Sequence, residues 1–313
     1  MNAAGVAVAA VQIVLTIAVA PLLVGMMRVI RARIEGRVGP PIRQPWRDLR
    51  KLFAKQRMVS TNTSVVFSIA PLVLVASAVL VAGIVPFVST RTALDQVGDL
   101  FAVVYLLLLG TVFLALAGLD AGTAFGGMGA SRAMTITAIA EPTVLVAIFA
   151  LSVSTGSSNL GTIVANTLSH PKTAVSPASL LAFAALAIVT IAETGRIPVD
   201  NPSTHLELTM IHEAMVLEYA GPDLALVEWA SAVKELLYLT LLVDLFMPFG
   251  IATSAAPVAV LVAIVAWVGK VFVLAIAVTV VESTNAKLRL FRVPELVSIS
   301  LGLAFLALAI RFL

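Results

Sequence analysis

The sequence contains no cysteine, and it has only three histidines among 313 residues. Without cysteine, the chain cannot form thiolate zinc sites, Fe–S clusters, disulfides or a thiol nucleophile. So few histidines leave little scope for haem or copper. We therefore expect no metal site and no cofactor in this chain.

Charge is also scarce. Asp, Glu, Lys and Arg make up 12% of the chain, whereas the apolar residues AVILMFWYC make up 60%. Soluble domains carry about 25% charged and about 45–50% apolar residues. This imbalance argues against a soluble enzyme or a disordered regulator. The net charge of +3 does not indicate nucleic-acid binding, because the basic residues cluster beside apolar segments, as in membrane proteins.

The apolar residues form long continuous runs. A transmembrane helix needs about 20 of them, whereas a membrane β-barrel would show alternating segments of about ten. The sequence therefore predicts an all-α, polytopic membrane protein with about eight transmembrane helices, forming one integral membrane domain over 1–313. The candidate spans are residues 4–27, 65–88, 97–119, 133–154, 178–194, 232–250, 255–281 and 293–312.

Lysine and arginine are distributed unequally between the two sides of these spans. Sixteen lie on one side, three on the other, and Lys270 lies inside a span. Because basic loops stay in the cytoplasm, we expect both termini to be extracytoplasmic in the cell (inner) membrane. Two cytoplasmic loops of about 37 residues follow, 28–64 and 195–231.

The first loop holds a predicted amphipathic helix over 41–57. Trp46, Leu49, Leu52 and Phe53 share one face, and charged residues cover the other. Such a helix could dock a cytoplasmic partner or lie on anionic lipid, and the sequence leaves both interpretations open. The candidate docking residues are Arg37, Arg47, Asp48, Arg50 and Lys51.

The second loop is rich in carboxylates. Thr204 and Glu207 fit a capping box, which predicts a helix over 204–219. His205 and His212 would lie about 10.5 Å apart along its axis, too far to share one metal ion. Carboxylates and histidines buried against protein are instead candidates for proton handling.

Several ionisable residues lie inside the predicted spans, where charge is costly and usually functional. From the helical rise, Glu193 lies near the cytoplasmic interface, Glu141 about 12 Å in, Lys270 about 16 Å in and Asp244 about 18 Å in. No basic residue lies at the estimated depth of Glu141. The outer halves hold no ionisable group except near their ends, so a proton entering from the cytoplasm would leave sideways through another subunit. For Lys270 and Asp244, a structural ion pair is the alternative interpretation.

Three motifs stand out along the chain. They are Arg37-Val38-Gly39-Pro40 with Gln44-Pro45, Asp48 and Lys51-Leu52; Gly129 to Arg132 with Glu141; and Glu193 to Asp200 with Glu218-Tyr219. Together they resemble the membrane subunit 1 family of respiratory NADH:quinone oxidoreductases. The sequence of the second loop is more similar to the branch found in group 4 nickel–iron hydrogenases, which is the membrane anchor of the formate hydrogenlyase subunit 4 or hydrogenase-4 type. The resemblance covers essentially the whole chain.

This resemblance implies an eight-helix anchor with no metal of its own. Its partners would be hydrogenase large and small subunits and an Fe–S subunit, which carry the nickel–iron and Fe–S centres, together with antiporter-like membrane subunits and lipid. Nucleic acid is not expected. The resemblance implies a proton path through Glu141, Glu193, Asp200, Glu207 and Glu218; Asp244 and Lys270 join it on depth alone. Val199 and Asn201-Pro202 depart from the quinone-reducing pattern, but a quinone-site subunit and a lone secondary transporter remain alternatives.

Overall fold

The computed structural model describes residues 3–90, 94, 97–200, 210–253 and 256–312. Within these ranges the secondary structure is helical, with no β-strand, which confirms the predicted all-α class. The α-helices are α1 (Ala3–Ile34), α2 (Gln44–Phe53), α3 (Val65–Ile84), α4 (Leu100–Asp120), α5 (Ala124–Ser152), α6 (Leu160–Ser169), α7 (Pro171–Ala174), α8 (Pro177–Glu193), α9 (His212–Val216), α10 (Gly221–Phe246), α11 (Pro257–Thr284) and α12 (Val293–Ile310).

Six helices of the described chain are long and apolar enough to cross a membrane: α1, α3, α4, α5, α11 and the segment ending in α12. The chain is therefore a multi-pass membrane protein. The other two predicted spans fall on α8, which has 17 residues, and on α10, which has 26 residues and carries several charges. The count of eight spans stays a prediction.

Short polar side chains begin several of these helices. Ser64, Asp99 and Thr123 each accept a hydrogen bond from a backbone N–H in the first turn of α3, α4 and α5. Such caps satisfy N–H groups that have no partner within the helix. The apolar runs of α3, α4 and α5 therefore form helices that begin at defined residues.

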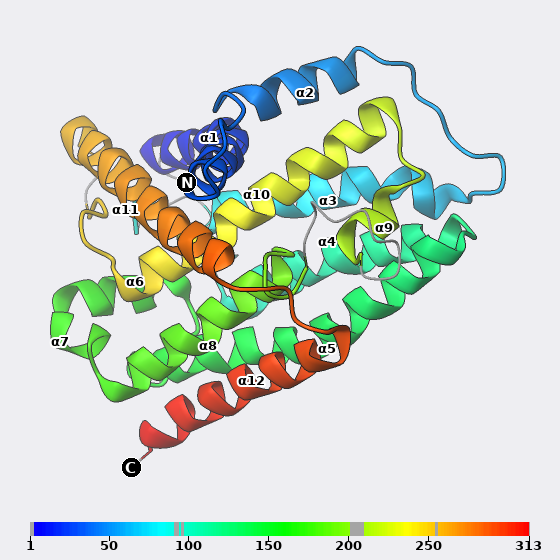
Figure 1. The fold of residues 1–313 in the computed structure, drawn as a ribbon. Coiled ribbons are helices and arrows are strands. Elements are labelled where there is room, and N and C mark those ends of the chain that lie inside the picture. Colours follow the sequence, from blue (N-terminus) through cyan, green and yellow to red (C-terminus); the bar gives the residue numbers. More distant parts are fainter. Residues whose placement is uncertain (1–2, 91–93, 95–96, 201–209, 254–255, 313) are drawn as a thin grey trace.

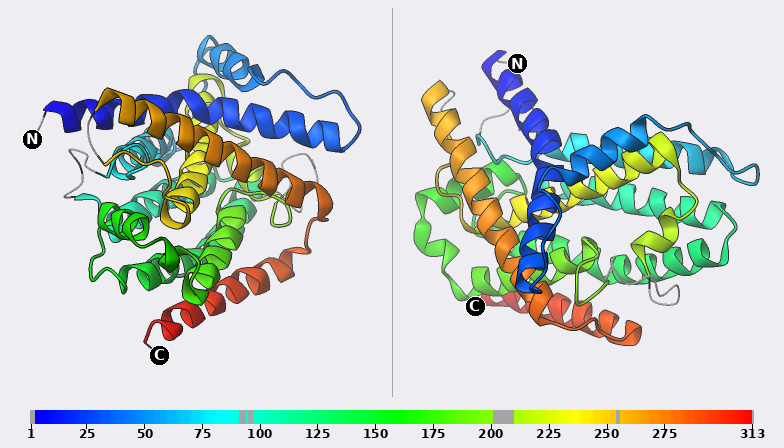
Figure 2. Two further views of the ribbon diagram at one scale, coloured as in Figure 1. Left: turned by 90° about the vertical axis from the view of Figure 1, so that its left-hand side faces the viewer. Right: turned by 45° about the horizontal axis from the view of Figure 1, so that its top comes forward.

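The helices form a bundle crossed by two further helices. In Figure 1, α3, α4, α5, α8 and α12 run roughly side by side, and α10 packs against α3, α8 and α1. Helices α1 and α11 contact each other and α10, and the left view of Figure 2 shows them lying across one face of the bundle. This arrangement surrounds α10 and buries its charged residues Glu235 and Asp244.

Both predicted loop helices are shorter than expected. Helix α2 covers 44–53 rather than 41–57 and packs on α1 and α10, burying Leu49 while Trp46 and Phe53 stay exposed. Of the helix predicted over 204–219, the described part is helical only over α9. Residues 201–209, which include the candidate Glu207, lie outside the described residues. Helix α1 reaches Ile34 and α10 begins at Gly221, so helix extends into both predicted loops.

Candidate functional site

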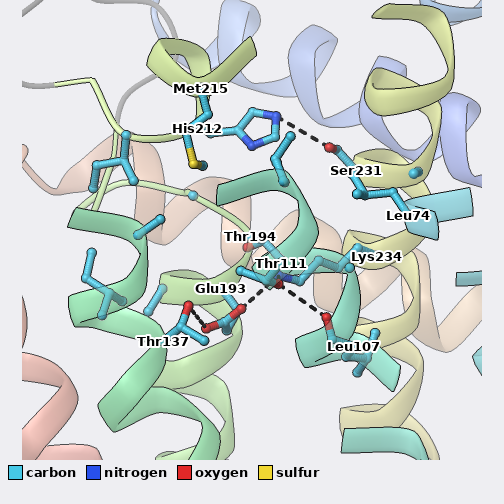
Figure 3. Close-up of a pocket in the computed structure, with 18 of the residues that line it drawn as sticks. Leu74, Leu107, Thr111, Thr137, Glu193, Thr194, His212, Met215, Ser231 and Lys234 are labelled. Carbon is cyan, nitrogen blue, oxygen red and sulfur yellow. Dashed lines mark hydrogen bonds and ion pairs between the residues drawn. The ribbon is translucent and has the colours of Figure 1, made fainter. Parts of the chain in front are cut away.

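A cavity of about 140 Å³ lies between α3, α4, α5, α8, α9 and α10 (Figure 3). Much of its wall is apolar, but polar side chains reach it from these helices and from the segment after α8. These side chains are Ser77, Thr111, Thr137, Glu193, Thr194, Asp200, His212, Ser231 and Lys234. The cavity has room for a few water molecules, since one water occupies about 30 Å³ in the liquid.

An ion pair between α8 and α10 crosses the middle of this cavity. The Lys234 ammonium lies 2.7 Å from the Glu193 carboxylate, whose side chain is only 2% exposed. Thr137 donates a hydrogen bond to Glu193 over 3.1 Å, and Lys234 donates one to Thr111 over 2.8 Å (Figure 3). Four helices therefore meet in one chain of hydrogen bonds, so a change in charge at Glu193 would affect them all.

Glu141 lies one helical turn beyond Thr137 on α5 and is 7% exposed. One of its carboxylate oxygens, Oε2, is buried without a hydrogen-bond partner among the described residues. The charges of Glu193 and Lys234 act on this carboxyl group. The helical rise predicts no basic residue at the depth of Glu141, but the charge of Lys234 nevertheless acts on this carboxyl group. Lys234 lies near the middle of α10, and its long side chain extends to Glu193.

Asp200 organises the segment on the opposite side of the cavity. Its Oδ1 pairs with the Lys287 ammonium at 2.9 Å, and its Oδ2 accepts hydrogen bonds from the backbone N–H groups of Ile211 and His212. The His212 ring then reaches the Ser231 hydroxyl on α10 at 3.4 Å (Figure 3). Asp200 thus holds the start of α9 at the cavity wall.

The glycine-rich start of α5 allows α9 to approach closely. A Cβ on Gly129 would lie 2.8 Å from the carbonyl oxygen of Ile211 and 2.9 Å from the Ala214 methyl group. Arg132, one turn later, donates to the Met210 carbonyl over 3.3 Å. The motif from Gly129 to Arg132 therefore has a physical explanation, because a larger residue at Gly129 would push α9 away from α5.

A second ionic network lies beside the cavity. Arg196 pairs with Glu235 on α10 at 2.6 Å and with Glu282 on α11 at 3.4 Å, and Glu282 also pairs with Arg31 on α1 at 3.0 Å. In the sequence, Arg196 and Arg31 serve only as topology signals, and Glu282 is not among the predicted site residues. Opposite charges near the ends of several apolar segments are the signal in the sequence that could have identified the network.

The predicted path residues are not all brought together. Glu193 and Asp200 line the cavity and Glu141 lies beside it, whereas Glu218 is exposed and is not in the wall. Asp244 and Lys270 also lie outside the cavity wall. Lys270 donates to the Met247 carbonyl over 2.9 Å and acts electrostatically on Asp244, whose two buried oxygens have no hydrogen-bond partner among the described residues.

The predicted docking residues lie on the α1–α2 segment. Arg37, Arg47, Arg50 and Lys51 are exposed, Arg37 pairs with Glu35, and Asp48 accepts a hydrogen bond from Gln44. The exposed apolar side chains Trp46 and Phe53 lie among them. This surface therefore combines positive charge with apolar area.

Histidine and carboxylate side chains do not gather in groups of three that could hold a metal ion, in the part of the chain that the structure describes. Acidic groups nevertheless line the cavity together with Lys234 and His212. Groups of this kind can bind and release protons, and the threonine and serine hydroxyls between them can pass hydrogen bonds along.

Comparison with known proteins gives a consistent result. A family profile described as NADH dehydrogenase matches residues 6–312. The chain is 34% identical to hydrogenase-4 component C of Escherichia coli over 95% of this chain and 92% of that protein. It is 33% identical to formate hydrogenlyase subunit 4 of the same organism over 95% of both chains.

More distant relatives include a subunit of the NADH-quinone oxidoreductase of Thermomicrobium roseum, 31% identical over 62% of this chain and 63% of that protein. Among solved structures, a chain of the membrane-bound sulfane sulfur reductase, an archaeal respiratory membrane complex, superposes with a TM-score of 0.83. That match covers 97% of this chain and 98% of the other at 20% identity, which indicates a shared fold.

Proposed function

The chain belongs to the NADH dehydrogenase family, and on this premise we propose that it is the membrane anchor and proton-path subunit of a group 4 nickel–iron hydrogenase complex. Both hydrogenase-type relatives match over 95% of the chain at 33–34% identity, whereas NADH-quinone oxidoreductase relatives match over 62% to 75% at 29–31% identity. The hydrogenase branch is therefore favoured. In such a complex the anchor links electron transfer on the cytoplasmic side to proton movement through partner subunits.

The observation that carries the proton-path role is the ionic cavity. Glu193 is paired with Lys234 inside a ring of helices, and the buried Glu141 carboxyl group lies within their electrostatic influence. Isolated charges are costly inside a membrane unless they are paired or functional. We propose that protons pass from the cytoplasm by Asp200 and Glu193 to Glu141, with Glu207 and Glu218 on the approach.

The route beyond Glu141 is also a proposal. Asp244 and Lys270 interact on α10 and α11, and they would form a second station from which a proton leaves sideways into an antiporter-like partner. The positive, partly apolar α2 surface, with Arg47 and Arg50 exposed, would dock the hydrogenase arm. That arm, made of large, small and Fe–S subunits, would carry the nickel–iron and Fe–S centres.

Purification of the intact complex in mild detergent tests this function. We expect hydrogenase large and small subunits, an Fe–S subunit and antiporter-like subunits to co-purify, together with nickel and iron. A chain that purifies alone and, when reconstituted, transports protons or another substrate by itself would contradict the proposal and favour a lone transporter.

The relation to an NADH-quinone oxidoreductase subunit favours one further candidate, a quinone-site subunit. Solvent extraction of the purified complex distinguishes the two. Stoichiometric quinone, together with electron transfer to added quinone and without nickel, would favour the quinone-reducing alternative.

A further inference from the structure

Helices α1 and α3 both pack on α10, and each contains a proline in its interior. These prolines are Pro21 in α1 and Pro71 in α3. Proline has no backbone N–H, so the carbonyl group four residues earlier loses its helical donor. The carbonyl groups affected are those of Ile17 and Phe67. In a membrane protein such a carbonyl needs another donor, because lipid offers none.

Tyr219 supplies that donor on α3. Its hydroxyl group donates to the Phe67 carbonyl oxygen over 2.8 Å. The two aromatic rings stack with centroids 4.1 Å apart, and both residues are buried. Burial raises the pKa of the Tyr219 phenol, and the Asp223 and Asp120 carboxylates raise it further, so the hydroxyl keeps its proton and remains a donor.

The same arrangement occurs on α1. The indole N–H of Trp229, on α10, donates to the carbonyl oxygen of Ile17 over 3.4 Å, the carbonyl that Pro21 leaves without a helical donor. Tyr219, directly before α10, and Trp229, on α10, therefore each donate to a carbonyl group that lacks its helical donor because of a proline. The position of the acceptor follows from the proline in both cases.

The Tyr219 bond links the loop after α8 to the cavity wall. Tyr219 lies between α9, which is packed against α5 at Gly129, and the start of α10. On α3, Leu74 and Ser77 follow Pro71 within two helical turns, and both line the cavity. A movement of the loop would therefore reach α3 at the point where its helical hydrogen bonding is interrupted.

We propose that Tyr219 is a positioning residue that sets the path of α3 around Pro71 and thereby the width of the cavity at Leu74 and Ser77. The effect on proton movement rests on the proposed function. The effect on α3 itself does not, and can be measured in the full chain alone.

The chain has no cysteine, so spin labels can be placed at Val65 and Leu80, both exposed and on either side of Pro71. Tyr219→Phe keeps the ring but removes the donor. Pro71→Ala restores the N–H that bonds Phe67. We expect Tyr219→Phe to change the label distance and to lower the thermal midpoint by about 2 °C or more, but to do neither in the Pro71→Ala chain.

Tyr105→Phe, an identical chemical change at an exposed tyrosine of α4, should have no effect on either measurement. The proposal is overturned if Tyr219→Phe leaves both measurements unchanged, or if it has the same effect with and without Pro71. If Tyr219→Phe fails to fold, recovery by Pro71→Ala supports the proposal, and failure of the double variant as well overturns it.

In the reconstituted complex, Tyr219→Phe should lower the number of protons moved per turnover while turnover continues, and Pro71→Ala should restore that ratio. A wild-type complex that moves no protons would contradict the proposed function, whereas the label distances and thermal midpoints of the chain decide whether Tyr219 positions α3. A ratio unaltered by Tyr219→Phe in a pumping complex would overturn the link from α3 to the cavity.

Discussion

Glu193 and Lys234 form an ion pair of 2.7 Å between α8 and α10, and the neighbouring ion pair has the opposite polarity. Arg196, three residues after Glu193 and just past the end of α8, pairs with Glu235, which directly follows Lys234. The C-terminal end of α8 and helix α10 thus each contribute one positive and one negative charge to these two ion pairs. Protonation of Glu193 would leave Lys234 unpaired while the neighbouring pair held the two sides together.

The first prediction concerns Glu141. Glu141→Gln keeps the shape of the side chain and removes its ability to titrate, so hydrogenase turnover with a soluble electron donor should continue while proton pumping in sealed vesicles is lost. Glu295→Gln, at a glutamate in the first turn of α12 and outside the cavity wall, is the matched control and should pump normally. Pumping at the wild-type ratio in Glu141→Gln, or failure of that variant to assemble, would show that the glutamate is not a proton carrier.

The second prediction concerns the Glu193–Lys234 pair. Lys234→Met leaves a buried carboxylate without its partner, which typically costs about 3 kcal/mol or more of the free energy of unfolding. Adding Glu193→Gln should recover part of that loss. Arg37→Met, which breaks a pair with Glu35 in which neither side chain is buried, should cost about 1 kcal/mol or less. Thermal unfolding of these variants measures this, and equal losses at Lys234 and Arg37 would contradict it.

The third prediction concerns Glu213, in α9. Burial raises the pKa of its carboxyl group, and the Glu228 and Asp200 carboxylates raise it further although His212 and Arg28 oppose them. The unfolded chain therefore loses this proton at a lower pH than the folded chain, so the folded state loses stability as pH rises between the two pKa values. Glu213→Gln should flatten that decline in thermal midpoints measured from about pH 4 to about pH 8. An unchanged slope would refute it.

Topology gives the fourth prediction. The sixteen-to-three distribution of lysine and arginine places the 28–64 and 195–231 loops in the cytoplasm and both termini outside. Single cysteines at Ser60 and Ser157 should react with an impermeant reagent from opposite sides of the membrane. Labelling of both from the same side would refute this topology.

The last prediction concerns docking. Arg47→Glu combined with Arg50→Glu reverses the charge of the exposed α2 surface, so the hydrogenase arm should be released from membranes. Lys172→Glu changes an exposed lysine on the predicted outer side and should leave the arm in place. An arm that stays bound to the double variant at moderate salt would favour the alternative in which α2 lies on lipid.

Much of the architecture follows from local sequence. The long apolar runs predict membrane helices because a backbone in lipid must satisfy its own hydrogen bonds. The costly charges inside those runs, above all Glu141, identify candidate functional positions before any contact is known. The absence of cysteine excludes thiolate-bound metal centres.

What only the tertiary structure decides is which charges meet. Depth along a helix says nothing about which face the helix turns toward its neighbours, so the sequence alone does not predict that the Lys234 ammonium reaches Glu193. Glu282 gains its role only because α11 and α1 cross beside α10. The Phe67 carbonyl finds Tyr219, 152 residues away. Helix and membrane patterns are local and repeat along the chain, whereas ion pairs depend on crossing angles and side-chain reach, which the packing of the whole bundle determines.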